Sequence, residues 1–256
     1  MIPKVIHYCW FGGNQLPKSA VKCINSWRKF FPDYEIKEWN ETNFDVNIIP
    51  YTSEAYRLKK YAFVSDYARL WILYRYGGVY FDTDVEVIKG FDDILTVGPF
   101  MGCENPATKG TTSTQSCIAP GFALGVNPGL GLGAHPGLGL YKELIDFYEN
   151  FHFLDDQGNI VKHTIVSVVT DLLCKKGLKN TSEIQFVGGV YIYPDDYFCP
   201  YSQITGKLTL TNNSHSIHLY DGSWLDRKGK ISLLMRKYMG IQVFMFFCKL
   251  RRFFKK

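Results

Sequence analysis

A long helical pattern that runs directly into a short apolar strand is the feature that most constrains the fold. The stretch "SEAYRLKKYAFVSDYARLWILYRY" (53–76) predicts one amphipathic helix, with Ser53 as its N-cap and an end at the glycine pair that starts with Gly77. The strand "VYF" follows at once, and Asp82 and Asp84 stand at its C-terminal end. Open α/β sheets bind their ligands at this edge, so both aspartates are candidate site residues.

The rest of the chain alternates between the periodicity of strands and that of helices. A strand "PKVIHYCW", a helix "LPKSAVKCINSWRKFF" and a strand "DYEIKEW" predict a βαβ unit at the start. Later patterns predict the helices "KELIDFYENF" and "TIVSVVTDLLCKKG" and the strands "GPFMGCEN", "SCIAPGFALGV" and "SIHLY". With 256 residues and 46% hydrophobic side chains, the chain can bury one substantial core, which predicts a single α/β domain.

The motif "PGLGL" occurs twice, at 128–132 and 136–140. Its glycine spacing differs from the G-x-G-x-x-G of dinucleotide-binding loops, so we predict no such loop here. Two interpretations stay open: a flexible surface loop, or a loop that shapes an acceptor pocket.

Cysteine usage and the N-terminal sequence predict a cytoplasmic protein. The seven cysteines lack zinc-binding spacing and are odd in number, which predicts reduced thiols. The N-terminus has neither the apolar core nor the cleavage site of a secretory signal. No stretch reaches the roughly 18 apolar residues of a membrane span, so we expect no transmembrane anchor.

Charge divides the chain into two parts. Residues 227–256 carry ten Lys or Arg and no Asp or Glu, whereas residues 1–226 carry 19 basic and 24 acidic side chains, a balance of −5. We therefore predict a globular domain at 1–226 and a separate basic tail at 227–256. The acidic balance of the domain argues against nucleic acid as a partner.

The end of the tail, "GIQVFMFFCKLRRFFKK", has the pattern of an amphipathic interfacial helix. At about 100° per residue, one arc of such a helix is apolar and the other basic. The apolar arc consists of Phe246, Phe247, Leu250, Phe253 and Phe254. This pattern predicts peripheral attachment to an anionic membrane surface, on the inner face of the cell membrane. The alternative is a final helix docked on the domain, whose phenylalanines close the core.

The sequence Asp-Thr-Asp at 82–84 predicts a site for Mn²⁺ or Mg²⁺. These cations bind through one or two carboxylates and complete their coordination shell with water and phosphate oxygens, which points to a phosphate-bearing substrate. The alternative is a pair of exposed turn aspartates.

Four motifs together resemble a known family. "HYCWFGG", "SDYAR", "YGGVYFDTD" and "IHLYDGSW" occur in the order found in the DXD-containing sugar-binding region of glycosyltransferase family 32, and are distantly similar to the glucosyltransferase domain of large clostridial toxins. The resemblance covers roughly residues 2 to 225. It implies a GT-A fold, that is, a single Rossmann-like nucleotide-sugar-binding domain with a mixed central sheet. It also implies a nucleotide-sugar donor, a divalent cation, and transfer with retention of anomeric configuration.

The resemblance assigns one group of residues to the donor. It implies that Trp10 stacks on the base of the donor; His7 and Cys9 of the same motif are further donor-binding candidates. Packing at the end of the first strand is the alternative for Trp10, and a structural role is the alternative for His7. Asp66 and Arg69 are three apart on a helix and share a face, so they can hold the sugar hydroxyls and the diphosphate. A surface ion pair is their alternative.

A second group is assigned to the metal and the leaving group. Asp82 resembles the aspartate that contacts ribose and donor sugar, with a contact to the cation through water. Asp84 resembles the direct metal ligand, and His218 a C-terminal metal ligand, with a satisfied core histidine as the alternative. Ser223 and Trp224 resemble the pair that folds over the diphosphate and the leaving-group oxygen. The catalytic candidates are Asp82, Asp84, Arg69 and Trp224.

The resemblance implies a retaining hexosyltransferase in surface or capsular polysaccharide synthesis. It favours a UDP-sugar as donor, with GDP-mannose open, and a saccharide acceptor that can be linked to polyprenyl diphosphate. Retention can arise by double displacement or by front-face attack; the residues mark no carboxylate as a nucleophile, and the resemblance favours front-face attack. Two other classes stay open: a metal-dependent hydrolase of nucleotide sugars or phosphoesters, and a non-catalytic membrane-surface adaptor.

Overall fold

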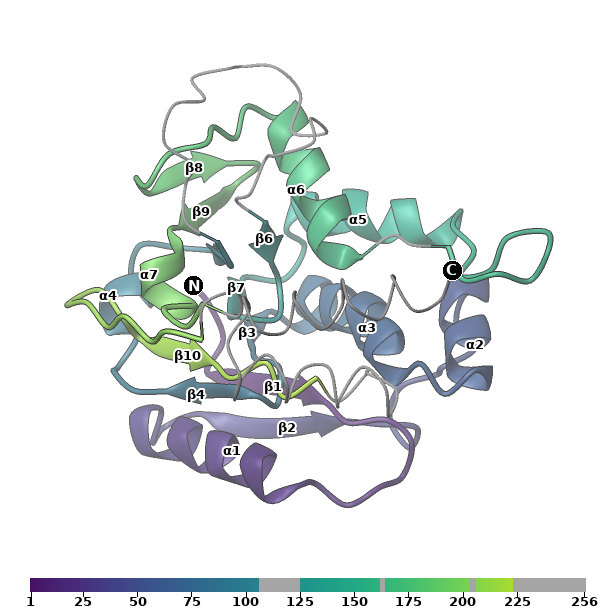
Figure 1. Cartoon of the computed structure of the whole chain (residues 1–256), viewed down its shortest axis with the longest axis horizontal. Helices are drawn as coiled ribbons and strands as arrows, with labels where there is room; N and C mark the ends of the chain where they lie inside the picture. The colour runs from purple at the N-terminus through teal and green to yellow at the C-terminus, as the bar shows by residue number, and fades with distance from the viewer. Residues whose placement is uncertain (106–124, 162–163, 203–205, 223–256) are drawn as a thin grey trace, which may run out of the picture.

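The alternating patterns build a mixed sheet flanked by helices (Figure 1). The computed structural model describes residues 1–105, 125–161, 164–202 and 206–222. The strands are β1 (Val5–Cys9), β2 (Glu35–Trp39), β3 (Gly78–Tyr80), β4 (Val85–Val87), β5 (Phe100–Cys103), β6 (Val126–Asn127), β7 (Leu132–Ala134), β8 (Gln185–Val187), β9 (Val190–Tyr193) and β10 (Ser216–His218). The helices are α1 (Lys18–Phe30), α2 (Pro50–Arg57), α3 (Tyr61–Tyr76), α4 (Asp92–Leu95), α5 (Gly139–Glu149), α6 (Ile165–Lys175) and α7 (Asp195–Phe198).

Parallel and antiparallel pairs are combined in the main sheet, whose order within the described ranges is β2-β1-β3-β7-β5-β9-β8, with β6 paired to β5. β1 is parallel to β2 and β3, and β5 is parallel to β9; β7 is antiparallel to both of its neighbours. A separate two-stranded sheet pairs β4 with β10. The predicted α/β class with a mixed central sheet is thereby confirmed.

The first βαβ unit forms as predicted. β1 and β2 pair in parallel with Val5 opposite Glu35, and α1 connects them. Pro17 precedes the first turn of α1, where its missing N–H costs no helical hydrogen bond. The amphipathic α1 buries Trp27, whose indole N–H donates to the carbonyl of Val85 at 2.8 Å. This bond ties α1 to β4 beneath the aspartate turn.

The long helical pattern at 53–76 is not one helix, which corrects the sequence prediction. α2 ends at Arg57 and α3 begins at Tyr61, because Lys59 takes a left-handed conformation with φ of 57°. Ser53 therefore lies inside α2 and is not an N-cap. The predicted end is confirmed: Gly77, with φ of 63°, donates its N–H to the carbonyl of Leu73 and closes α3.

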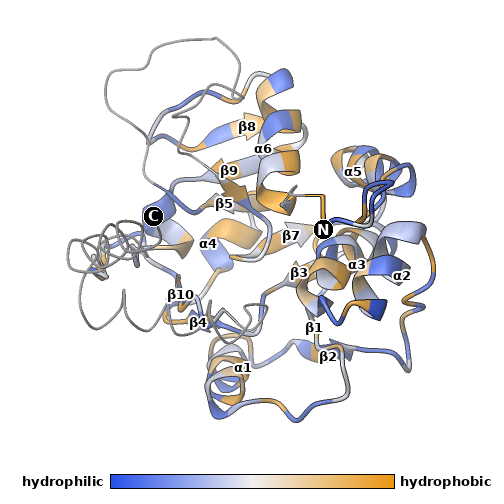
Figure 2. Cartoon of the chain, turned by 45° about the vertical axis from the view of Figure 1, so that its right-hand side comes forward, coloured by the Kyte–Doolittle hydropathy of each residue, from blue (hydrophilic) through white to orange (hydrophobic). Residues whose placement is uncertain are grey.

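Two apolar clusters cover the two faces of the sheet. One joins residues of α2, α3, α5 and α6, and the other joins residues of α1, α4 and α7. Residues of β3 and the residue that follows it alternate between the clusters: Tyr80 packs in the first, and Val79 and Phe81 pack in the second. Figure 2 shows hydrophobic stretches in β5 and β7 at the middle of the sheet. This packing fixes β3 and thus the position of the aspartates that follow it.

The structure confirms the prediction of reduced cysteines only in part, and two predicted segments lie entirely or almost entirely outside the described residues. Cys9, Cys23, Cys103 and Cys199 carry free thiols as predicted, whereas Cys174 is disulfide-bonded, which corrects the prediction of uniformly reduced cysteines. The predicted strand "SCIAPGFALGV" lies almost entirely outside the described residues, as does the basic tail at 227–256.

His7 has a structural position, so the structure does not support its assignment to the donor. The side chain is only 2% exposed and is not among the residues that line the pocket described below. Its Nδ1 accepts a hydrogen bond from the indole of Trp39, and its Nε2 lies 3.0 Å from the carbonyl of Gly77. An imidazole that accepts at Nδ1 and donates at Nε2 is the neutral tautomer. Burial lowers the pKa of His7 to about 4.

This neutral His7 predicts that acid destabilises the fold. An unfolded histidine titrates near 6.5 and the folded one near 4, so the unfolded state binds more protons between these values. The stabilisation is present above pH 6.5 and is lost as the pH falls toward 4. The pKa difference corresponds to about 3 kcal/mol in the free energy of unfolding. Urea unfolding across this range should give a flatter pH profile for His7→Gln than for wild type or for His135→Gln, in which an exposed histidine is replaced.

Candidate functional site

A pocket of about 640 Å³ opens where β1 and β3 end. β1 and β3 are parallel, so the residues that follow them meet at one edge of the sheet. Most of the predicted site residues line this pocket: Cys9, Trp10, Asp66, Arg69, Asp82, Asp84 and His218. Its volume is in the range of pockets that hold a small-molecule ligand.

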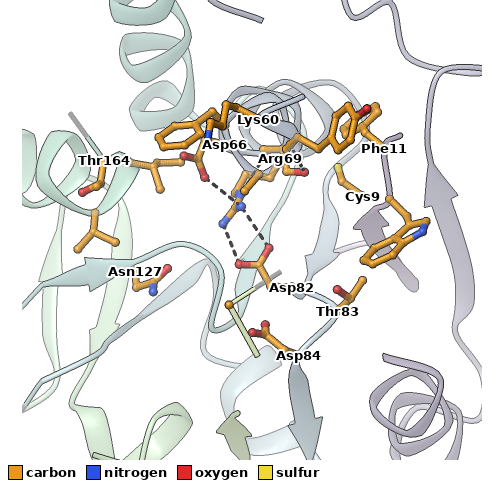
Figure 3. Close-up of a pocket in the computed structure, with 18 of the residues that line it drawn as sticks. Cys9, Phe11, Lys60, Asp66, Arg69, Asp82, Thr83, Asp84, Asn127 and Thr164 are labelled. Carbon is orange, nitrogen blue, oxygen red and sulfur yellow. Dashed lines mark hydrogen bonds and ion pairs between the residues drawn. The ribbon is translucent and has the colours of Figure 1, made fainter. Parts of the chain in front are cut away.

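Arg69 forms the centre of the site (Figure 3). Its Nη2 lies 3.1 Å from both Asp66 Oδ1 and Asp82 Oδ1, and its Nη1 lies 3.3 Å from Asp82 Oδ2. Nε donates to the carbonyl of Ser65, and the hydroxyl of Tyr80 donates to Asp82. The arginine side chain is only 4% exposed, so the alternative of a surface ion pair is wrong.

Burial and neighbouring charges have opposing effects on the pKa values in the cluster of Asp66, Arg69 and Asp82. Burial raises the pKa of Asp66 to about 7. The positive charge of Arg69 acts to lower this pKa, whereas the negative charge of Asp82 acts to raise it further. Burial would discharge Arg69, but Asp82 and its other neighbours hold its pKa above the ordinary value. The cluster therefore presents one cation between two carboxylates at the edge of the pocket.

Pairing between β4 and β10 brings Asp84 to His218. His218 stands opposite Val85 in the antiparallel register, and its Nε2 lies 3.2 Å from Asp84 Oδ1. Asp84 Oδ2 accepts the backbone N–H of Asp221 at 3.0 Å. Burial acts to raise the pKa of Asp84, but His218 and this N–H outweigh it and lower the pKa. Burial likewise opposes the charge of His218, but Asp84 holds the pKa of the imidazole well above its usual range.

The chemistry of these side chains fits a divalent cation. Asp84 offers a carboxylate at this point of the pocket, and His218 offers an imidazole once a cation displaces its proton; Mn²⁺ accepts both ligand types. In the described part of the chain no group of three or more His, Cys, Asp or Glu side chains could hold a metal alone. Donor phosphate and water would have to supply the remaining ligands. Asp82 already contacts Arg69 and Tyr80, so a contact between Asp82 and the cation through water stays a prediction.

The first strand supplies the opposite end of the pocket. Trp10 is partly exposed there, and its indole N–H donates to the carbonyl of Asn14 at 2.6 Å. Stacking of this ring on a base stays a prediction. Cys9 is buried, and burial raises the pKa of its thiol to about 12, so it contributes packing rather than a thiolate. Ser223 and Trp224 lie outside the described residues, which end at Gly222 on the pocket wall.

Sequence reasoning missed Gly129. The first "PGLGL" copy is buried, and the carbonyl of Gly129 accepts the N–H of Asp82 at 3.0 Å. A Cβ at Gly129 would lie 1.9 Å from Asp82 Oδ2 and 3.0 Å from Arg69 Nη1. For this copy the surface-loop interpretation is therefore wrong. The repeated glycines were a signal, but only the fold shows that one of them touches Asp82.

Gly129→Ala should impair the site more than the fold. The added methyl must displace the carboxylate of Asp82 or the arginine beside it, and we expect donor turnover to fall about 10- to 100-fold, as for other small misplacements of reacting groups. Gly139→Ala is the matched control in the second "PGLGL" copy, because nothing lies within 4 Å of its Cβ position. Steady-state kinetics and melting temperatures should be measured for both variants. Equal activity of the two would contradict this role of Gly129.

Comparison with known proteins now identifies the region that holds these residues. Residues 17–100 match a family model described as "Glycosyltransferase sugar-binding region containing DXD motif". Residues 17–100 are therefore similar to the sugar-binding region of DXD glycosyltransferases. Asp82 and Asp84 are its DXD aspartates, and Asp66 and Arg69 lie within it. The mixed sheet confirms the predicted α/β class, and the family match agrees with the GT-A fold that the motifs imply.

Curated relatives include two enzymes of Schizosaccharomyces pombe. Inositol phosphoceramide mannosyltransferase 3 is 32% identical over 37% of this chain and 27% of its own length. Inositol phosphoceramide mannosyltransferase 1 is 32% identical over 39% of this chain and 33% of its own length. This chain thus spans a third or less of either enzyme. An uncharacterized glycosyltransferase of Acanthamoeba polyphaga mimivirus is 25% identical over 84% of this chain and 83% of its own length.

Solved structures with partial similarity to this chain include two glycosyltransferases. The PaToxG glycosyltransferase gives a TM-score of 0.41 at 19% identity, over 57% of this chain and 59% of that chain. The galactosyltransferase LgtC, in complex with donor and acceptor sugar analogues, gives 0.38 at 15% identity, over 75% and 74%. Among the described residues, no helix has the length and apolar character needed to cross a membrane.

Proposed function

We propose that this protein is a metal-dependent, retaining glycosyltransferase that moves a hexose from a nucleotide sugar to a saccharide acceptor. The observation that carries the proposal is the meeting of two charge pairs in one pocket of the DXD region: Arg69 with Asp82, and Asp84 with His218. The first pair is suited to hydroxyl groups and the second to a cation with its phosphates.

The residues divide the donor between them along the pocket. Trp10 offers a flat aromatic face for the base. Asp82 and Asp66 can accept hydrogen bonds from hydroxyl groups, while Arg69 holds both side chains in place. Asp84 and His218 would hold Mn²⁺ or Mg²⁺, which supplies positive charge where the leaving diphosphate becomes more negative. Trp224 would donate its indole N–H to the leaving-group oxygen.

Retention follows from front-face attack in this proposal. The acceptor hydroxyl approaches on the side from which the diphosphate departs, and its proton passes to a leaving phosphate oxygen. The bond from the sugar to that oxygen breaks while the new glycosidic bond forms. A covalent intermediate would require a carboxylate nucleophile beneath the sugar, and the proposal assigns none.

The choice of donor and acceptor draws on the relatives' names. Two of them are mannosyltransferases that act on inositol phosphoceramide, a lipid, which supports a mannosyl donor such as GDP-mannose beside the UDP-sugars. A lipid-linked acceptor, including a polyprenyl-diphosphate-linked saccharide, also agrees with these names. Surface or capsular polysaccharide would be the product of such an enzyme.

A donor screen tests the proposal. UDP- and GDP-sugars are added to the full chain with Mn²⁺, and with EDTA in parallel. We expect one donor to raise the melting temperature and to be hydrolysed slowly in the presence of the metal only. No protection by any nucleotide sugar would overturn the proposal. Hydrolysis as fast as transfer to every acceptor tried would favour the hydrolase instead.

We further propose that the basic tail attaches the enzyme to the cytoplasmic face of the membrane. Removal of residues 241–256 should leave donor turnover unchanged on soluble substrates and abolish salt-sensitive binding to vesicles that contain anionic lipid, because each Lys or Arg contributes about 1 kcal/mol near such a surface. Vesicle flotation at low and high salt measures this. If the truncated chain bound vesicles equally well, or if it unfolded, the tail would not be a membrane anchor that the fold can do without.

A further inference from the structure

Glu104 is a pocket carboxylate that the proposed function leaves without a role. It directly follows β5 and lines the same pocket as Asp82 and Asp84. It is part of neither charge pair of the DXD region, and it lies just beyond the residues matched by the family model. Its place in the pocket becomes visible only when the sheet is assembled.

A chain of hydrogen bonds connects Glu104 to the DXD motif. The N–H of Asp82 donates to the carbonyl of Gly129 at 3.0 Å, and the N–H of Gly129 donates to Asn127 Oδ1 at 2.8 Å. Asn127, only 9% exposed, then donates from Nδ2 to Glu104 Oε2 at 3.0 Å. Because Gly129 fixes which end of the amide is the oxygen, the NH₂ group of Asn127 must face Glu104. Glu104 is thereby held at a set position relative to Asp82.

The electrostatics of Glu104 suit a neutral polar ligand. Among the ion pairs of the described residues, none includes this carboxylate. Burial raises its pKa, while the hydrogen bond from Asn127 and the charge of His218 lower it. A partly buried carboxylate held by amides, without a cation at hydrogen-bond distance, has unused acceptor capacity. Sugar hydroxyls are donors that can use it without bringing a charge into the pocket.

The position of Glu104 agrees with the sugar end of a donor. In Figure 3, Asn127 lies on one side of Asp82 and Asp84, and Cys9 and Phe11 lie on the other. If the base lies at Trp10 and the diphosphate at Asp84, the group beyond the diphosphate reaches the side where Asn127 presents Glu104.

We infer that Glu104 binds a hydroxyl of the transferred sugar and sets the sugar preference of the enzyme. The inference rests on the proposed function and adds to it a specificity-determining residue. In this role a carboxylate oxygen of Glu104 accepts a hydrogen bond from a sugar hydroxyl. Glu104 forms no covalent bond to the anomeric carbon.

The variant Glu104→Gln tests this role with little change of shape. The amide oxygen of the glutamine must face Asn127, so its NH₂ group faces away and presents a donor where the wild type has an acceptor. Calorimetric titration in Mn²⁺ compares the nucleoside diphosphate with the nucleotide sugar that wild type prefers and with its epimers. We expect affinity for the diphosphate within two-fold of wild type, affinity for the preferred nucleotide sugar at least ten-fold lower, and little discrimination among epimers. Glu35→Gln, at an exposed position of β2, is the control.

The possible results separate a failure of the inference about Glu104 from a failure of the proposed function. If Glu104→Gln keeps the wild-type preference and affinity for the nucleotide sugar, the inference is wrong. If it keeps that affinity but loses all turnover, Glu104 acts in the chemical step rather than in sugar binding, and the inference is also wrong. If wild type binds no nucleotide sugar, the proposed function itself fails. Should Glu104→Gln not fold, Glu104→Asp keeps the charge but retracts it by one methylene, and the same loss of sugar discrimination is expected.

Discussion

Asp84→Asn is expected to lower metal-dependent donor turnover by about 100-fold or more while the chain stays folded. The cation contributes several kcal/mol of charge stabilisation to the transition state, and each 1.4 kcal/mol corresponds to a factor of ten. The asparagine side chain keeps one oxygen that can accept a hydrogen bond from the backbone N–H of Asp221 or from His218. Residues 218–221 therefore keep a contact with position 84. The variant loses the negative charge that a divalent cation requires. Turnover should be measured over a Mn²⁺ titration, with near-ultraviolet circular dichroism as the check on folding.

The matched control for this variant is Asp33→Asn. Asp33 has a side chain that is 78% exposed, and its only ion-pair partner among the described residues is Lys4, at 3.8 Å. An exposed pair of this kind contributes little, so activity and stability should equal those of wild type. If Asp84→Asn turned over donor at the wild-type rate in saturating Mn²⁺, Asp84 would not be a metal ligand.

The parts of this protein that the sequence predicts correctly are those fixed by local pattern. β1, α1 and β2 each show the residue period of one strand or one helix. Gly77 ends α3 because this position has a positive φ, which glycine adopts without a steric cost. The break between α2 and α3 was not predictable in this way. It occurs at Lys59, a residue without a turn preference, in a stretch that has neither glycine nor proline. The turn at Lys59 lets α2 pack on α3 and α5, while α3 also packs on β1 and β3, and this tertiary packing overrides the continuous helical pattern.

The candidate site shows the same division. Asp82 and Asp84 stand out because carboxylates directly follow an apolar strand. Glu104 and Asn127 do not, because only the pairing of β5 with β6 brings them together. His218 reaches Asp84 only through the register of β10 on β4. Side chains that depend on long-range strand pairing are invisible to periodicity and require either the fold or a family pattern.

Arg69→Met should cost both stability and donor binding. The guanidinium is the only cation at hydrogen-bond distance from Asp66 and Asp82 among the described residues, and its removal leaves two carboxylates facing each other at a partly buried site. Removing one partner of a buried pair typically costs about 3 to 5 kcal/mol in the free energy of unfolding. Urea unfolding measures this loss. Arg75→Met is the control, because Arg75 lies on the same helix with an exposed side chain over Trp71, and its loss should cost less than about 1 kcal/mol.

The pH dependence of Arg69→Met separates loss of charge pairing from loss of packing. In the folded wild type Asp66 already has a pKa raised to about 7, against an ordinary value of 3.8, and without Arg69 burial acts on it unopposed. A carboxylate whose pKa is raised by folding favours the folded state only when protonated. The destabilisation should therefore be largest above pH 7 and should shrink as the pH falls toward 4. Adding Asp66→Asn to Arg69→Met should restore part of the stability at pH 8 by removing one unpaired charge, but not donor binding. A loss of stability that is equal at pH 5 and pH 8, and unchanged in the double variant, would show that Arg69 acts through packing alone.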